Sequence, residues 1–144
     1  MTEIAAKVIG RDLSISTKHA VEISKFIRGK SIKKSKELLN KVIEGKIAIP
    51  FTRFNRDMGH KKGNIAAGRY PKSASLEIVK LLNSLEANAQ NKGLDVNSLY
   101  IKKIIANRAS RPWHFGRQRR IKMKRTHIEI IAEEFQKKWS KDNS

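Results

Sequence analysis

The sequence predicts an α+β fold: three helices packed on one face of a small three-stranded antiparallel sheet. Apolar residues recur at helical spacing in three segments, each bounded by residues that start or stop a helix. Three other segments are short and rich in β-branched or aromatic residues, as strands are. With 144 residues, of which 39% are hydrophobic, the chain suits a single domain, residues 1–144, with a modest core.

The first two helices are expected at residues 17–28 and 32–44. Ala20, Ile23 and Ile27 form one apolar stripe, and the second helix repeats this pattern around Leu39. Serine is a favoured N-cap and glycine a favoured C-terminal stop. The residues expected at the helix ends are Ser16, Gly29, Ser31 and Gly45.

The third helix has the clearest pattern. Pro71 suits its first position, because a helix leaves that N–H unbonded, and Gly93 closes it. The apolar residues between them fall on one helical face. They are Ala74, Ile78, Leu81, Leu82, Leu85 and Ala89.

Strands are expected at residues 3–9, 98–108 and 126–133. The last of these alternates apolar and polar residues, with Ile131 as the exception.

Two internal segments fit no element of this core. Residues 50–70 are punctuated by glycine and charge and are expected to form a long loop. Residues 109–125 join two strands that should pair, and seventeen residues are too many for an ordinary hairpin turn. Either this segment is disordered, or the strands continue outward as a long hairpin arm over about 100–128. Residues 135–144 are expected to be a frayed C-terminal tail.

Positive charge dominates the chain. It has 32 Lys and Arg against 13 Asp and Glu, a net charge of +19. Such a charge repels itself and predicts a polyanionic partner, nucleic acid first and an anionic membrane surface second. Ten of the 33 residues between Asp95 and Glu129 are Lys or Arg, and none is acidic.

The residue types of this basic segment favour RNA. Arg makes planar, multi-donor contacts to phosphate, and Trp113, His114 and Phe115 can stack on unpaired bases. Structured RNA offers splayed bases, whereas the major groove of a uniform A-form helix does not. An arm from Tyr100 to Gly116 reaches roughly 50 Å at ~3.3 Å per residue. Since no core exists that far out, its order has to come from a surrounding partner.

Other classes fit less well. The chain has no cysteine, which excludes disulfides, a cysteine-based zinc site and a thiol nucleophile. Neither a signal peptide nor a membrane span is visible, so a soluble cytoplasmic protein is expected. We also expect no membrane partner and no obligate homo-oligomer. No cofactor and no metal site is expected, because the four His are scattered.

Two alternatives remain open. One is a ribonuclease using His60, His114 and His127 as acid and base, but His114 and His127 lie in the basic hairpin with no nearby carboxylate to orient them, so no enzymatic activity is expected. A basic DNA-binding protein, chromatin-associated or regulatory, needs the same charge, and the first two helices resemble a helix-turn-helix only weakly.

Several stretches, in order along nearly the whole chain, resemble one family. They are ISTKHAVEISKFIRGKSIKKSKELLNKVI (15–43), IPFTRFNRDMGH (49–60), AGRYPKSAS (67–75), LEANAQNKGLDVNSLYI (85–101), GR (116–117) and HIE (127–129). The chain resembles the ribosomal large-subunit protein twenty-two family, number seventeen in eukaryotic naming, in its archaeal and eukaryotic branch.

The resemblance implies a non-catalytic ribosomal protein whose α+β domain sits on ribosomal RNA at the surface of the large subunit. It also implies a long β-hairpin whose tip lines the nascent-peptide exit tunnel, opposite the fourth large-subunit protein. Assembly of the subunit and shaping of the tunnel wall follow as expected roles. The implied partners are large-subunit RNA, neighbouring ribosomal proteins and the nascent peptide.

Charge and resemblance together give the expected site. The residues expected to bind RNA are Lys18, Arg28, Lys30, Arg53, Arg56, His60, Lys61, Lys62, Arg69, Lys72, Arg108, Arg111, Trp113, His114, Phe115, Arg117, Arg119, Arg120, Lys122, Lys124 and Arg125. The residues expected to line the tunnel are Trp113, His114, Phe115, Gly116, Arg117, Gln118, Arg119 and Arg120.

The sequence departs from the family pattern at two places. Only KKGNIAA stands between His60 and Gly68, where relatives usually have more residues. Trp113 and His114 stand where relatives often carry an Arg-Ala pair before Gly116.

Overall fold

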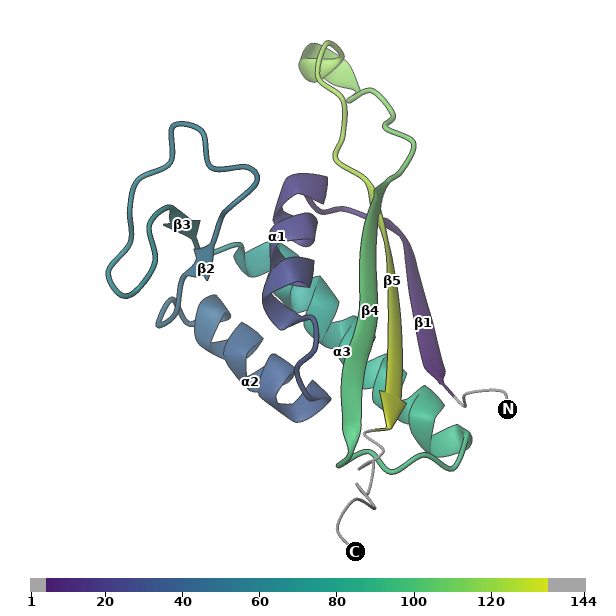
Figure 1. The fold of residues 1–144 in the computed structure, drawn as a ribbon. Helices are drawn as coiled ribbons and strands as arrows, with labels where there is room; N and C mark the ends of the chain where they lie inside the picture. The colour runs from purple at the N-terminus through teal and green to yellow at the C-terminus, as the bar shows by residue number, and fades with distance from the viewer. Residues whose placement is uncertain (1–4, 135–144) are drawn as a thin grey trace, which may run out of the picture.

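A three-stranded antiparallel sheet is the frame of the protein in the computed structural model, which describes residues 5–134 (Figure 1). The strands are β1 (Ala6–Leu13), β4 (Leu99–Arg108) and β5 (Thr126–Glu134), in the spatial order β1-β5-β4. The last strand in the sequence is therefore the central one, which joins the two ends of the chain in one sheet.

Three helices cover one face of this sheet: α1 (Thr17–Ile27), α2 (Ile32–Ile43) and α3 (Lys72–Asn91). Helix α3 packs on β1, and α1 packs on β4. The predicted α+β fold with its three helices is confirmed.

The core lies between the helices and the sheet. In β5, Ile128, Ile130 and Ala132 are fully buried, whereas the alternate residues face away from the helices and are only partly covered. The predicted face of α3 is also in the core except for Leu81, which is half-buried. The apolar residues that recur every second position in the strand and every 3.6 positions in the helix thus pack together in one layer.

Most boundaries lie within one residue of prediction, and the end of β1 differs most. Strand β1 extends to Leu13 instead of ending at residue 9, because a register shift between Gly10 and Leu13 lets its pairing with β5 resume. Pro71 is the N-cap of α3, one residue before the expected place.

A second, very small sheet closes the segment after α2. Strands β2 (Ile49–Pro50) and β3 (Gly68–Arg69) pair antiparallel. Between them lies the loop 51–67, which contains an isolated bridge between His60 and Ala67. The sequence does not predict this pair of strands.

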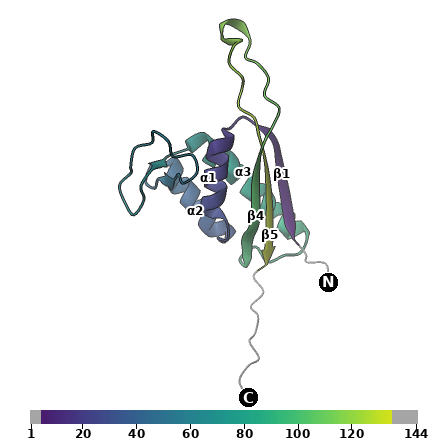
Figure 2. The same ribbon diagram turned by 45° about the horizontal axis from the view of Figure 1, so that its top comes forward.

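Beyond β4 and β5 the two chain segments continue outward together as the arm, residues 109–125, which stands clear of the domain in both views (Figure 1, Figure 2). A single 3-10 turn, Gly116–Gln118, forms its tip, where Gly116 adopts a φ of 67°. The backbone hydrogen bonds across the arm run from Ala109 to Arg125 (3.2 Å), from Met123 to Pro112 (2.8 Å) and from His114 to Ile121 (2.9 Å). The expected tail, residues 135–144, lies outside the described residues.

Candidate nucleic-acid interface

Glu22 fixes the start of the loop 51–67 against α1. Its side chain is 1% exposed. The carboxylate accepts hydrogen bonds from the backbone N–H groups of Thr52 (3.3 Å), Arg53 (2.8 Å) and Phe54 (2.9 Å). A buried carboxylate needs such donors to offset its lost hydration. These contacts bring a distant chain segment beside the first turns of α1.

A pocket of about 420 Å³ lies between α1 and this loop. Phe51, Phe54 and Met58 supply its apolar lining. His19 of α1 also lines it and meets the Phe51 ring edge to face, with 5.5 Å between the ring centroids. This cavity is called the α1–loop pocket below.

Cations surround the apolar part of the α1–loop pocket. Lys18, Arg53, Arg56 and Arg69 all line it. The Lys18 Nζ is 5.7 Å, and the Arg53 guanidinium carbon 5.3 Å, from the centroid of the Phe54 ring. Four of the predicted RNA-binding residues, from α1, the loop and β3, are therefore brought together at one hollow.

The electrostatic field of the pocket extends to the arm. Burial lowers the pKa of His19 below its ordinary value, and the positive charges of Arg69 and Lys124 lower it further. Lys124 belongs to the arm, so the arm and the pocket act on the same imidazole. The N-terminal end of α1 lies between the loop and the base of the arm in Figure 1.

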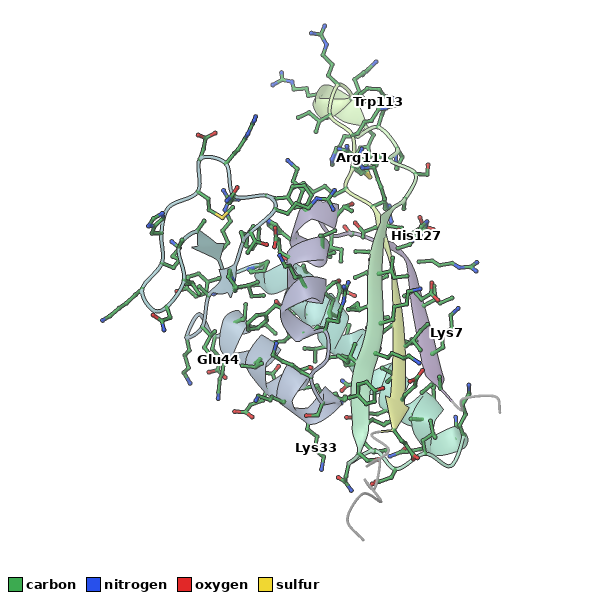
Figure 3. All side chains as sticks on the ribbon, in the orientation of Figure 1. Lys7, Lys33, Glu44, Arg111, Trp113 and His127 are labelled. Atoms are coloured by element: carbon green, nitrogen blue, oxygen red, sulfur yellow. The ribbon has the colours of Figure 1, made fainter. Side chains whose placement is uncertain are left out.

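Aromatic and aliphatic side chains are exposed on the arm. Trp113 is 58% exposed, Phe115 86% and Ile121 57%. Figure 3 shows Trp113 and Arg111 on the arm, away from the body of the domain. Large apolar side chains without cover, set among cations, suit contact with the faces of bases.

Cations also stiffen the arm. The Lys122 Nζ lies 4.5 Å from the centroid of the Trp113 ring. Arg111 donates to the carbonyls of Met123 (3.1 Å) and Lys122 (3.4 Å) on the opposite segment. Arg119 donates to the Gly116 carbonyl at 3.2 Å, which braces the tip.

The end of β1 and the turn after it hold the base of the arm. Thr126 is fully buried, and its Oγ1 donates to the Ile15 carbonyl at 2.9 Å. Arg125 donates to the Asp12 carbonyl at 3.0 Å, and the Asp12 N–H donates to Nδ1 of His127 at 3.1 Å. The direction in which the arm leaves the domain is thus set by contacts more than 100 residues apart in sequence.

Other predicted residues lie apart from this face. Arg28 is the C-cap of α1, about 15 Å from Lys18 at 1.5 Å per residue, and Lys30 follows two residues later. Arg28 donates to the Ile104 carbonyl at 3.3 Å, and Lys30 bonds the Phe26 carbonyl.

The remaining predicted residues are at the rim of the loop, at the start of α3 and along the arm. The Lys61 Nζ is 6.0 Å from the centroid of the Tyr70 ring. His60, Lys62, Lys72, Arg108, Arg117, Arg120 and Lys124 are exposed.

The ion pairs of the described residues lie away from this face. Within residues 5–134 the ion pairs are Lys7–Glu129, Lys36–Glu86, Lys41–Glu37, Lys46–Glu44, Lys80–Glu77 and Lys102–Glu133. None of the predicted RNA-binding residues is a member of these pairs. Lys7 and Glu44, labelled in Figure 3, mark the body of the domain, well away from the arm. Neither the loop nor the arm contributes a lysine or an arginine to these ion pairs, and the arm contains no acid.

Sequence reasoning missed His19 and Phe54. A signal for Phe54 exists, because TRFNR places a ring between two arginines, the same pattern that singles out Trp113 and Phe115. His19 has no such signal. Its role at the pocket depends on the tertiary contact of α1 with the loop.

This face consists of cations and aromatic rings. Among residues 5–134, no group of three His, Asp or Glu side chains is arranged to hold a metal ion. Within the same range, no helix is long and apolar enough to cross a membrane. A small α+β domain with a cationic pocket and a cationic arm defines a protein equipped to bind a structured polyanion.

The comparisons give the family. Residues 8–133 match the family described as "Ribosomal protein L22p/L17e", so the chain belongs to it, and the family predicted from the sequence is confirmed. A "Large ribosomal subunit protein uL22" of Nanoarchaeum equitans is 45% identical over 139 residues, 92% of this chain and 80% of the relative. The protein of the same name in Archaeoglobus fulgidus is 43% identical over 136 residues, 90% of this chain and 88% of the relative.

A third relative points to the same branch. The "Large ribosomal subunit protein uL22" of Methanopyrus kandleri is 42% identical over 140 residues, 92% of this chain and 88% of the relative. All three are archaeal, in agreement with the predicted branch. The family is structural and non-enzymatic, which agrees with the expectation that this protein is not an enzyme.

Proposed function

We propose that the protein is a structural constituent of the large ribosomal subunit in the cytoplasm, where it binds ribosomal RNA, aids subunit assembly and lines the nascent-peptide exit tunnel with the tip of its arm. Membership of a ribosomal protein family supports the first part, and the archaeal relatives carry the large subunit in their names. RNA binding and tunnel lining rest on the charge and shape described above.

The main support for the proposal is that the ion pairs and the acid-free basic arm lie in different parts of the molecule. The acids of the described chain are mostly paired on the helices and the sheet, whereas the arm contains no acid and the pocket is lined by four cations. A surface with this much unneutralised charge gains affinity by releasing counterions from RNA. Its concentration on two projecting segments favours an RNA that surrounds them over a flat duplex face.

The arm suits a path through packed RNA. It is thin, because two antiparallel segments form it, and it presents rings and cations along its length. RNA on several sides would cover Trp113 and Phe115, which the domain itself leaves exposed. The tip, residues 113–120, would then emerge at a tunnel wall beside the fourth large-subunit protein and the nascent peptide.

Co-sedimentation tests the proposal. Tagged protein in a cell lysate is run on a sucrose gradient and then washed at high salt. We expect it to travel with the large subunit and to stay bound, because an enclosed arm cannot leave by charge screening alone. Sedimentation as free protein, or with DNA, would refute the ribosomal assignment and favour the DNA-binding alternative.

A further inference from the structure

We propose that the α1–loop pocket receives a single unstacked nucleotide of RNA, whose base packs on Phe54 and whose phosphate is held by the surrounding arginines. This inference rests on the proposed binding of ribosomal RNA and goes further, because it assigns one nucleotide to one cavity.

The size of the cavity suits one small unit. Its volume of about 420 Å³ lies in the range of small-molecule sites, roughly 300–1,000 Å³. A double helix presents a convex backbone and cannot enter such a hollow. A nucleotide turned out of its stack can enter.

The lining matches both halves of a nucleotide. The Phe54 ring lies beside the guanidinium of Arg53 at 5.3 Å, and bases in RNA complexes stack on rings and on guanidinium planes. Arg56 and Arg69 are exposed at the same pocket and can make paired hydrogen bonds to phosphate oxygens. A site for phosphate alone has no need of Phe51, Phe54 and Met58 beneath the cations.

The pocket is held in shape without its ligand. Glu22 binds three consecutive backbone N–H groups of the loop, including that of Phe54 itself. The pairing of β2 with β3 fixes Arg69 on the other side. A preorganised site loses less conformational entropy on binding than a mobile loop does.

His19 adds a polar group at the apolar wall. Its imidazole contacts the Phe51 ring and is partly buried beside Arg69. Burial and nearby cations favour its neutral form, which has one donor and one acceptor nitrogen for the edge of a base.

Photo-crosslinking locates the contact directly. The full-length protein is bound to a large-subunit ribosomal RNA transcript containing 4-thiouridine, irradiated and digested, and the crosslinked peptides are identified by mass spectrometry. We expect one set of crosslinks in residues 51–58, in addition to those of the arm. Crosslinks confined to the arm would overturn the pocket but leave RNA binding intact, whereas no binding at all would overturn both.

Affinity measurements test the role of the ring. Phe54→Leu should weaken binding to the same transcript about tenfold, in the range for loss of one stacked base, while Phe54→Tyr should restore the affinity. The charge is unchanged, so the slope of log affinity against log salt should stay the same. Binding by Phe54→Leu within twofold of the wild type would overturn the proposal.

Phe115→Leu, on the arm, is the matched control for RNA binding itself. It removes an equally large ring that is 86% exposed and is not part of the pocket lining. A loss of affinity in Phe115→Leu but not in Phe54→Leu would leave RNA binding supported and the pocket refuted.

Discussion

Glu22 is the single residue on which the position of the loop 51–67 depends most. It is an acid buried at 1% exposure, and three loop N–H groups converge on it. Without those donors the buried carboxylate would have no hydrogen-bond partners. Without the carboxylate, the three N–H groups would lose their acceptor. The two groups therefore stabilise one arrangement of helix and loop.

Replacing Glu22 by Gln should lower the free energy of unfolding by about 1–3 kcal/mol. The amide keeps one acceptor oxygen but turns an NH₂ group toward backbone donors that need acceptors. Urea denaturation of the purified protein measures the change. An unchanged midpoint would mean that the loop is held by other contacts.

Glu37→Gln is the control for this change of charge. Glu37 pairs with Lys41 on the exposed surface of α2. Exposed ion pairs contribute little to stability. The same loss of one negative charge should therefore leave the urea midpoint nearly unchanged.

His19 should make the protein less stable as the pH falls through about 6.5. Burial, then Arg69 and Lys124, hold its folded pKa below its ordinary value of about 6.5. The unfolded chain therefore takes up a proton before the folded chain does, and stability is lost as the pH falls toward the lowered value. Unfolding free energies at pH 7.5 and pH 5.5 measure the loss.

His19→Gln isolates this contribution from the other histidines. The variant should lose less stability than the wild type between the two pH values, because its side chain does not titrate. Equal losses in both proteins would assign the pH dependence to another group.

At the scale of the elements, local patterns suffice for the helices. The start of α2 coincides with prediction because Ser31 accepts a hydrogen bond from the Lys34 N–H, a contact within one turn. The ends of α2 and α3 lie near Gly45 and Gly93, both with φ above 70°. These helix ends are therefore determined by residues within three or four positions in the sequence.

The strands and the pocket depend on distant residues and are predicted less well. Strand β1 continues past Gly10 only because β5 supplies partners through a register shift. Strands β2 and β3 are two residues each and exist through their mutual pairing. The sequence therefore singles out the cations of the site, but not the hollow in which Lys18, Arg53 and Arg69 meet.

The arm should be cleaved readily by trypsin in the free protein, within residues 109–124. Its segments are joined by exposed hydrogen bonds, and no apolar core covers its tip, where Phe115 is 86% exposed. We hypothesise that it opens often unless RNA surrounds it. Limited proteolysis with mass spectrometry of the products measures where cleavage occurs first.

Lysines on the helices provide the internal control for proteolysis. Lys36 and Lys80 belong to α2 and α3, which pack in the domain and should be cleaved late. Resistance of the arm to trypsin without RNA would contradict the hypothesis. Large-subunit RNA should slow cleavage of the arm more than cleavage of the helices.

For the whole molecule, the net charge of +19 is divided unevenly between two regions. The body of the domain carries the ion pairs, whereas the arm holds seven lysines and arginines and no acid. Self-repulsion of this charge opposes compact packing of the free arm against the body. Binding a polyanion relieves the repulsion, so folding of the arm and binding should be coupled.

Arg117→Ala measures the share of one arm cation in this coupling. Arg117 is exposed at the tip of the arm, and if it neutralises one phosphate, its loss should weaken RNA binding and flatten the salt slope by about one unit. Filter binding to a large-subunit RNA transcript at several salt concentrations gives the slope. The control is Lys80→Ala, which removes the same charge from α3, where Lys80 is paired with Glu77 at 2.8 Å. If both variants flatten the slope equally, the charge acts through the whole molecule. If the slope of Arg117→Ala equals that of the wild type, Arg117 faces the tunnel instead of RNA.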